Sequence, residues 1–160
     1  MLKRPNWDKY FLGLLKGIGR RATCDRGRSG AIIVSEHHTI LTTGYVGSAP
    51  GDKHCDEVGH YIVTVIQPDG TSSQHCQRML HAEENAILQA AMDGIPLRGA
   101  TLYCKMTPCL PCARRITRVG IKRVVAQKKY HADELSRQLF VDAKVKLDVI
   151  DDTLEEYKSQ

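Results

Sequence analysis

The sequence has no apolar run long enough to cross a membrane, and its first eight residues lack the apolar core of a signal peptide. Internal repeats, low-complexity tracts and interdomain linkers are also missing. The chain has 160 residues, of which 42% are hydrophobic and 26% charged, so it is long enough to bury a sizeable core. We therefore expect one cytoplasmic domain over residues 1–160, with no membrane partner.

A disulfide framework is not expected, although the chain has six cysteines. Two of them form the pair Cys109-x-x-Cys112, and three of the others lie near histidines in the sequence. Because no secretory signal precedes them, metal binding explains these cysteines better than disulfides do.

Acidic residues are missing between Arg98 and Lys129, where nine basic residues lie, although the net charge of the whole chain is only +5. A solvated helix face would explain this stretch. A field that favours a phosphorylated substrate or a nucleic acid is the sharper but less favoured explanation. Charge alone does not separate these two interpretations.

Hydrophobic periodicity predicts alternating strands and helices. Helices are expected over 7–19, 82–91, 111–119 and 132–140, and strands over 30–34, 40–44, 101–106, 124–126 and 145–150. After an opening hairpin, this order implies a mixed sheet with helices on both faces, an α/β fold. Residues 47–77 form an insertion that contains Gly, His and Cys, with a short strand over 61–66.

Two motifs carry the chemistry: His81-Ala82-Glu83 and Pro108-Cys109-Leu110-Pro111-Cys112. One imidazole and two thiolates are three ligands for a tetrahedral Zn²⁺, with the fourth position open for water, as in catalytic zinc sites. Both motifs are expected at helix starts, where the positive end of the helix dipole favours thiolates and an ionised Glu83. A zinc ribbon would need a second Cys-x-x-Cys, which this chain lacks.

Glu83 is not needed as a ligand, so it is free to move protons. Zn²⁺ lowers the pKa of a bound water to about 7. Glu83 could then take a proton from that water and deliver it first to a ring nitrogen and then to a departing amine. This cycle is the one that hydrolytic deamination requires.

From Trp7 to about Tyr130 the sequence resembles the deoxycytidylate deaminase family of zinc-dependent deaminases. The matching segments are residues 6–11, 24–26, 30–34, 43–45, 54–56, 75–76, 81–87, 107–113 and 120–122, followed by Tyr130. The opening Trp motif and the form His-Ala-Glu-x-Asn-Ala point to this family within the broader superfamily.

The resemblance implies a cytidine-deaminase-like, three-layer α/β/α fold with a mixed sheet of about five strands. It implies His81, Cys109 and Cys112 as Zn²⁺ ligands, Glu83 as proton shuttle, and conversion of dCMP to dUMP with release of ammonia. It also implies a homo-oligomer, a hexamer or smaller, and dCTP and dTTP as effectors. A nucleic acid partner is not expected.

The resemblance further implies a second, structural zinc. The matching positions are Cys24 and Cys55, with His75 and Cys76 completing a closed Cys₃His set. His54 and His60 are reserve candidates for the same site. Separate buried cysteines and surface histidines remain the alternative, and Cys104, within a strand, is expected to be a small core residue.

One departure from the family concerns the substrate. Family members usually read Gly-Tyr-Asn-Gly where this chain has Gly-Tyr-Val-Gly at 44–47, and the expected asparagine contacts a sugar hydroxyl in related enzymes. Valine cannot make that hydrogen bond, which weakens discrimination for the sugar. Lys105 also replaces a commoner threonine. Substrate contacts are expected from Arg26, Tyr45, Val46, Ala82, Asn85 and Tyr130, with Arg114 and Arg115 as further phosphate candidates.

Two other functions compete with deamination of dCMP. The first is deamination of another substrate, either a different pyrimidine nucleotide or a tRNA adenosine, in which case residues 98–129 would contact the RNA. The second is a zinc-binding nucleotide sensor that has lost turnover, and Val46 would indicate that loss. The opening Trp motif argues against the tRNA enzyme, and an intact Glu83 argues against the sensor.

Overall fold

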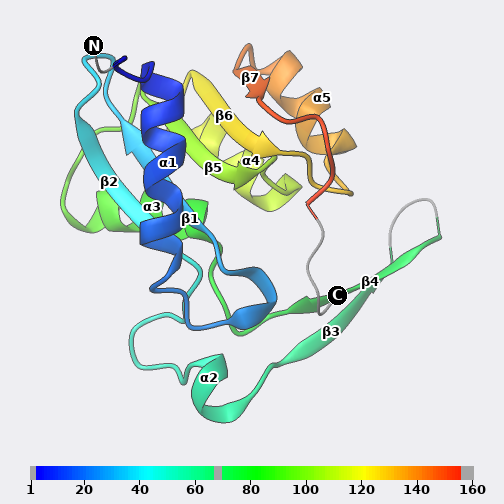
Figure 1. The fold of residues 1–160 in the computed structure, drawn as a ribbon. Helices are drawn as coiled ribbons and strands as arrows, with labels where there is room; N and C mark the ends of the chain where they lie inside the picture. The colour runs from blue at the N-terminus through cyan, green and yellow to red at the C-terminus, as the bar shows by residue number, and fades with distance from the viewer. Residues whose placement is uncertain (1–2, 67–69, 156–160) are drawn as a thin grey trace.

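The protein is described here from a computed structural model, which covers residues 3–66 and 70–155. A central mixed sheet has the strand order β2-β1-β5-β6-β7 (Figure 1). Its strands are β1 (Gly30–Val34), β2 (Ile40–Tyr45), β5 (Thr101–Met106), β6 (Arg123–Lys128) and β7 (Lys146–Val149). Strand β1 pairs antiparallel with both β2 and β5, whereas β5, β6 and β7 run parallel. The predicted mixed α/β sheet is confirmed.

Helix α1 (Trp7–Gly19) covers one face of the sheet, and it begins at Asn6, whose side chain accepts a hydrogen bond from the Lys9 amide at 2.8 Å. Its residues Phe11 and Leu15 pack against Ile32 and Tyr103 of β1 and β5. Because side chains alternate along a strand, the neighbours of Tyr103 in β5 point to the opposite face. The sequence pattern predicted this helix correctly.

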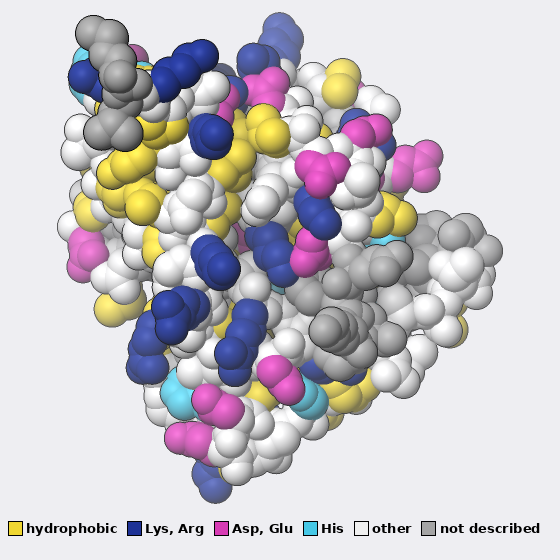
Figure 2. Space-filling view, in the orientation of Figure 1, with side chains coloured by type: hydrophobic (Ala, Val, Ile, Leu, Met, Phe, Trp, Pro, Cys, Tyr) yellow, Lys and Arg dark blue, Asp and Glu magenta, His cyan; other side chains and the backbone are white. Residues whose placement is uncertain are grey.

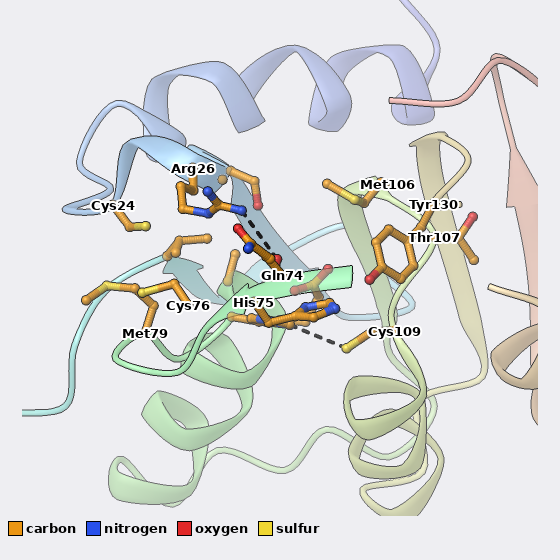
Figure 3. Close-up of a pocket in the computed structure, with 16 residues that line it drawn as sticks. Cys24, Arg26, Gln74, His75, Cys76, Met79, Met106, Thr107, Cys109 and Tyr130 are labelled. Carbon is orange, nitrogen blue, oxygen red and sulfur yellow. Dashed lines mark hydrogen bonds between the residues drawn. The ribbon is translucent and has the colours of Figure 1, made fainter. Parts of the chain in front are cut away.

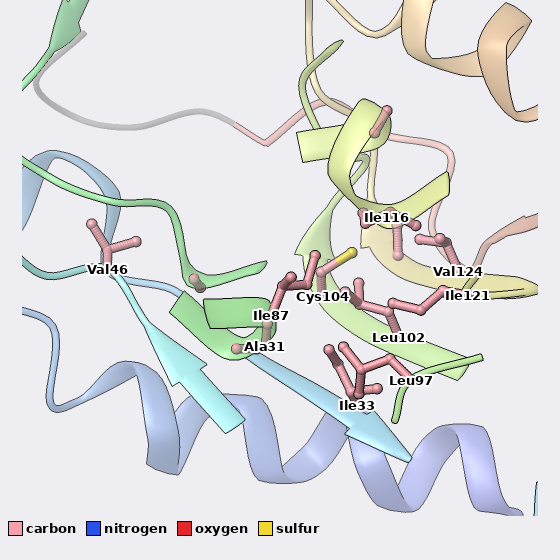
Figure 4. Packing of buried hydrophobic residues seen from close by; sticks show 14 of the residues in the cluster. Ala31, Ile33, Val46, Ile87, Leu97, Leu102, Cys104, Ile116, Ile121 and Val124 are labelled. Carbon is pink, nitrogen blue, oxygen red and sulfur yellow. The ribbon is translucent and has the colours of Figure 1, made fainter. Parts of the chain in front are cut away.

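The opposite face carries the larger core, which is covered by α3 (Ala82–Met92), α4 (Leu110–Arg118) and α5 (Glu134–Asp142) (Figure 4). Leu102 and Cys104 of β5 are fully buried there, so the prediction that Cys104 is a core residue is confirmed. Ile116 of α4 and Phe140 of α5 pack into the same cluster. The packing of these helices on the sheet fixes the positions of the first turns of α3 and α4, where the two predicted metal motifs lie.

Strand β2 and helix α3 approach each other very closely at Gly44. A Cβ atom at this position would collide with the backbone carbonyl of Ala82 and the backbone nitrogen of Ala86. The absence of a side chain therefore allows the start of α3 to lie directly against the sheet. This contact holds the first turn of α3 in place.

The insertion over 47–77 contains more structure than its sequence indicates. Instead of one short strand, it holds a single helical turn α2 (Cys55–Val58) and a two-stranded antiparallel sheet of β3 (Ile62–Ile66) and β4 (Ser72–Cys76). This hairpin extends away from the central sheet (Figure 1). Few of its side chains are buried, since both strands are mostly exposed or half-buried.

Across residues 3–66 and 70–155, none of the helices combines the length and the apolar character that a bilayer crossing requires.

Candidate metal and active site

Three predicted ligands converge where α3 and α4 begin. His81 and Cys109 each occupy the position that caps a helix, with extended backbone, and Cys112 lies in the first turn of α4. The Nδ1 atom of His81 lies 3.4 Å from Cys109 Sγ and 3.5 Å from Cys112 Sγ. The predicted placement of both motifs at helix starts is therefore confirmed.

The three donor atoms fit a zinc ion. All lie within 4.8 Å of one another. Tetrahedral zinc with Zn–N near 2.05 Å and Zn–S near 2.3 Å requires N···S separations of about 3.6 Å. The observed separations are close to this value, so one ion could contact all three atoms with little rearrangement. A set of three protein ligands leaves one position open, which is typical of catalytic zinc.

Local interactions favour a thiolate at Cys109. Hydrogen bonds from Cys112 and from His81 lower the pKa of Cys109 to about 4. The same contact with Cys109 raises the pKa of His81 to about 9. These shifts correspond to a cationic imidazole beside an anionic sulfur. A divalent cation would displace the proton that they share and bind both groups in their deprotonated forms.

Glu83 differs from expectation in its electrostatics. It lies in the first turn of α3, where the helix dipole should favour its ionised form. Its side chain is buried, however, and this burial raises the pKa of the carboxyl group above its usual value. A carboxyl group whose pKa is raised by burial holds a proton more readily than a solvated one, which suits a group that accepts and returns a proton.

A pocket opens beside these groups (Figure 3). Its wall includes His81, Glu83 and Cys109 from the two helix starts. Ala82 lies with them, and the other side chains come from five further segments: Cys24, Arg26 and Ser29 before β1, Val46 after β2, Gln74, His75, Cys76 and Met79 in and after β4, Met106 and Thr107 at the end of β5, and Tyr130 after β6. The catalytic candidates thus face a shared cavity.

Four of the six predicted substrate contacts line this pocket, namely Arg26, Val46, Ala82 and Tyr130. Tyr45 and Asn85 are absent from its wall. Asn85 instead donates hydrogen bonds to the backbone carbonyls of Tyr45 and Gly47, at 2.8 and 3.3 Å. Asn85 therefore positions the turn that carries Val46 rather than facing the cavity itself.

The two arginines proposed as further phosphate contacts, Arg114 and Arg115, are not among the pocket residues. Arg115 pairs with Glu84 of α3, with Nη2 2.9 Å from Oε1. This ion pair links α3 to α4 beside the metal site.

A second group of potential ligands lies next to the pocket: Cys24, Cys55, His60 and Cys76, whose donor atoms all lie within 4.8 Å of one another. Cys55 Sγ is 3.5 Å from Cys76 Sγ, and Cys24 Sγ is 3.6 Å from His60 Nδ1. The structure thus brings together all three of the predicted cysteines, together with one of the two reserve histidines. The other, His54, instead contacts the hydroxyl group of Thr23 at 3.0 Å.

His75 does not join this group, contrary to the ligand set expected from the sequence. His75 and Cys76 are consecutive residues of β4, so their side chains point to opposite faces of the hairpin. With Cys76 directed at the other cysteines, the His75 ring contacts Ser73 Oγ at 2.8 Å and lines the catalytic pocket. Burial there lowers the pKa of His75, which favours its neutral form.

Sequence reasoning missed Gln74, Met79 and Met106 as pocket residues. Gln74 and Met79 reach the pocket only because β4 folds back across the insertion, and the pattern of the insertion gave no signal for β4. The Arg26 guanidinium donates to the Gln74 carbonyl at 3.3 Å, which joins β4 to the segment before β1 (Figure 3). Met106 could have been found, because it ends a predicted strand two residues before Pro108.

One histidine and two cysteines form an open ligand set at two helix starts of an α/β fold, and a buried glutamate lies beside them. This combination is typical of metal-dependent hydrolytic enzymes. The profile of the family described as the cytidine and deoxycytidylate deaminase zinc-binding region matches residues 5–128. The chain belongs to this family, and with it to the zinc-dependent deaminases.

Two curated relatives show how far the similarity extends. The chain is 33% identical over 150 residues to ComE operon protein 2 of Bacillus subtilis, covering 94% of this chain and 74% of that protein. It is 38% identical over 143 residues to the deoxycytidylate deaminase of Saccharomyces cerevisiae, covering 89% of this chain. The chain spans only 44% of the length of that yeast protein.

Among solved structures, the dCMP deaminase of cyanophage S-TIM5, crystallised in complex with dCMP and dUMP, superimposes with a TM-score of 0.71 at 23% identity. The match covers 92% of this chain and 99% of the phage chain. At this level of identity the similarity confirms the cytidine-deaminase-like fold.

Proposed function

We propose that this protein hydrolyses the amino group of a cytosine nucleotide, converting dCMP and water to dUMP and ammonia. The observation that carries this proposal is the grouping of His81, Cys109 and Cys112 at a pocket whose wall also includes Glu83. Family membership supports it, as does the 38% identity to a yeast protein named deoxycytidylate deaminase.

In this proposal His81, Cys109 and Cys112 hold the zinc ion. When bound, zinc would supply Lewis acidity that lowers the pKa of a water molecule by several units. Glu83 accepts a proton from the attacking water, donates a proton to N3 of the base, and then delivers one to the departing amino group. The C4–N bond breaks as the C4–O bond becomes a carbonyl, so one water is consumed and one ammonia released.

The residues of the pocket wall are suited to a nucleotide, but they do not specify which sugar it carries. The wall contains the positively charged side chain of Arg26 and the aromatic rings of Tyr130 and His75. Val46 presents only an apolar side chain where the family usually has an asparagine. We therefore keep a second candidate, the deamination of another aminated pyrimidine nucleotide, which Val46 favours.

Deamination of tRNA receives less support. Five of the nine basic residues between 98 and 129 form ion pairs with carboxylates: Lys105 and Lys128 with Glu155, Arg115 with Glu84, Arg123 with Asp148, and Lys129 with Asp152. The basic stretch is thus interrupted by acidic side chains rather than forming the continuous stripe that an RNA backbone requires.

The second group, with His60 in place of His75, is proposed as a structural zinc site. Four protein ligands would close the coordination sphere, as in structural sites. The site joins three segments that are distant in sequence: the loop before β1, the insertion around α2, and β4. It would hold β4, and with it Gln74 and His75, against the catalytic pocket.

Homo-oligomerisation, dCTP and dTTP effectors and a cytoplasmic location stay predictions from the sequence. Apolar side chains exposed on β3, including Ile66 at 75% exposure, are a surface that an oligomer would cover. Light scattering on the purified protein measures the number of chains directly.

The proposed function is tested with zinc-loaded protein and a panel of dCMP, CMP, deoxycytidine, cytidine and a tRNA anticodon stem-loop. Ammonia release and product chromatography report deamination. Turnover of dCMP in preference to the others supports the proposal, whereas preference for another nucleotide supports the second candidate. Absence of ammonia release from every compound would support the inactive sensor, and activity on the stem-loop alone would support the tRNA enzyme.

A further inference from the structure

The chain after β7 runs back past the end of β6 (Figure 1). The backbone amide of Lys129 donates a hydrogen bond to the Thr153 carbonyl at 2.9 Å, and the Glu155 amide donates one to the Lys129 carbonyl at 3.0 Å. Lys129 and Leu154 thereby form a parallel bridge. We call residues 150–155 the strap, because this segment is fastened across the carboxyl end of β6.

Glu155 fastens the strap through two lysines. Its Oε1 atom lies 2.6 Å from Lys105 Nζ, and its Oε2 atom lies 3.4 Å from Lys128 Nζ. Only 13% of the Glu155 side chain is exposed, against 78% of that of Asp152, which pairs with Lys129 in the same strap. Figure 2 shows Lys and Arg side chains next to Asp and Glu side chains on this part of the surface. Because water and salt weaken exposed ion pairs, Glu155 is the stronger anchor of the two carboxylates.

The two lysines reach Glu155 from opposite faces of the central sheet. Lys105 lies two residues after Tyr103, whose ring packs against α1, so it points to the α1 face. Lys128 is paired in register with Met106, the next residue of β5, and therefore points to the other face. A carboxylate that contacts both must lie at the end of the strands. Lys105 stands where the family more commonly has threonine, so this anchor is a feature of the present chain.

The backbone that the strap holds leads directly into the wall of the catalytic pocket. Tyr130, which lines the pocket, is the residue after Lys129. The Lys128 carbonyl accepts a hydrogen bond from the Thr107 amide at 3.0 Å, and Thr107 also lines the pocket. Figure 3 shows Met106, Thr107 and Tyr130 together on one side of the cavity. The strap therefore supports this wall from behind.

Tyr130 depends on the strap more than its neighbours in the wall do. Met106 is part of β5, whereas β6 ends at Lys128, two residues before Tyr130. Among residues 3–66 and 70–155, the backbone hydrogen bonds recorded for Lys129 are both made with the strap. Loosening the strap would thus free Tyr130 while the helix starts that carry the candidate zinc ligands stay in place.

We propose that Glu155 is a positioning residue for nucleotide binding, which holds Tyr130 in the pocket wall by fixing the strap. The identity of the nucleotide rests on the function proposed above. A wall residue that contacts the substrate equally in the ground state and in the transition state contributes to affinity and not to the rate of the chemical step. Loss of the Glu155 contacts therefore raises KM and leaves kcat almost unchanged.

Steady-state kinetics of the zinc-loaded variant Glu155→Gln test this role. We expect KM for dCMP to rise about fivefold and kcat to stay within about twofold of wild type. Asp152→Asn is the matched control, because it removes an exposed carboxylate from the same strap and should leave both constants within about twofold. Lys105→Gln should raise KM by less, since Lys128 still contacts Glu155. Adding Lys105→Gln to Glu155→Gln should then change KM little further.

Hydrogen–deuterium exchange gives a second readout that needs no turnover. Peptides covering residues 127–131 should exchange faster in Glu155→Gln than in wild type, because the strap protects the Lys129 amide. Peptides covering 81–87, at the start of α3, should be unchanged. Asp152→Asn should match wild type in both regions. Zinc content and thermal unfolding establish that each variant is folded and loaded, and Lys105→Gln provides the same comparison if Glu155→Gln does not fold.

Four results would overturn the proposal: an unchanged KM in Glu155→Gln, a fall in kcat with KM unchanged, exchange at 127–131 equal to that of wild type, or effects of Asp152→Asn as large as those of Glu155→Gln. Failure of the proposed function would look different. In that case the wild-type protein would deaminate none of the nucleotides, and the exchange comparison would still decide whether Glu155 holds the wall.

Discussion

Cys55 Sγ lies 3.5 Å from Cys76 Sγ, so a one-turn helix and a hairpin strand meet at a single pair of sulfur atoms. Cys24 and His60 lie around the same point. Burial raises the pKa of Cys55, whereas hydrogen bonds from the Arg78 amide and from Cys55 outweigh burial at Cys76 and lower its pKa to about 7. This asymmetry provides one readily ionised sulfur in the group.

The first prediction separates the two histidines near this cluster. His60→Ser should lower the zinc content from two ions per chain to one, because it removes a ligand of the second site. His75→Ser should retain two ions, since the His75 side chain faces the catalytic pocket. Inductively coupled plasma mass spectrometry on dialysed protein measures both. One zinc per chain in fully active wild-type protein would contradict the second site.

The second prediction concerns Glu83. Glu83→Gln keeps the size of the side chain but cannot exchange protons, so kcat should fall by about 10²- to 10⁴-fold with zinc still bound. Glu84→Gln is the matched control, because Glu84 lies in the same helix turn but pairs with Arg115 instead of lining the pocket, so this variant should retain most activity. Steady-state assays with zinc analysis of each variant decide the matter, and an active Glu83→Gln enzyme would refute the proton-transfer role.

The third prediction tests the close contact between β2 and α3. Gly44→Ala should destabilise the protein by about 3 kcal/mol or more, because the new methyl group meets the α3 backbone and forces the helix away. Gly13→Ala is the matched control: it has open space around it within α1 and should stabilise the protein by up to about 1 kcal/mol. Urea denaturation of both variants measures the difference.

The fourth prediction concerns pH. Arg123 forms a bidentate hydrogen bond with Asp8, with Nη1···Oδ1 at 2.9 Å and Nη2···Oδ2 at 2.8 Å. This contact holds the pKa of Asp8 below its usual value. Stabilisation by the ionised group is therefore complete above the unfolded pKa of about 3.9, and it is lost as pH falls through the lower folded value.

Asp8→Asn should accordingly reduce the free energy of unfolding at pH 7 by about 1 kcal/mol, since partial exposure weakens the pair. Its difference from wild type should shrink below about pH 4. Asp142→Asn, which alters an exposed carboxylate bonded within its own helix, gives the baseline at each pH. A difference that stays constant down to pH 2.5 would show that the Asp8 charge is not the cause.

The central fold and the grouping of the three candidate zinc ligands could be predicted from the sequence because their signals are local. The apolar run of β1 and the helix start at Asn6 each depend on neighbouring residues alone. His81 and Cys109 are 28 residues apart, yet each lies at the start of its own helix, which the adjacent residues indicate. The chemistry was therefore predictable before the geometry was known.

The hairpin was not predictable in the same way. β4 has the sequence Ser-Ser-Gln-His-Cys, which contains no alternating apolar residues, and none of its residues is fully buried. Without β4, nothing in the sequence shows that His75 and Cys76 point in opposite directions. For this reason the sequence favoured His75 over His60, whereas the structure places His60 with the three cysteines.

The weak apolar packing of the insertion has a consequence for how the protein depends on metal supply. The described residues of the insertion, 47–66 and 70–77, bury few side chains beyond those at the cysteine cluster. An ion bound there would therefore supply stabilisation that a hydrophobic core supplies elsewhere. Partial chelation would then free the hairpin before the rest of the chain unfolds. The catalytic pocket would lose Gln74 and His75 from its wall, so zinc starvation would impair substrate capture even in chains whose reactive centre is still loaded.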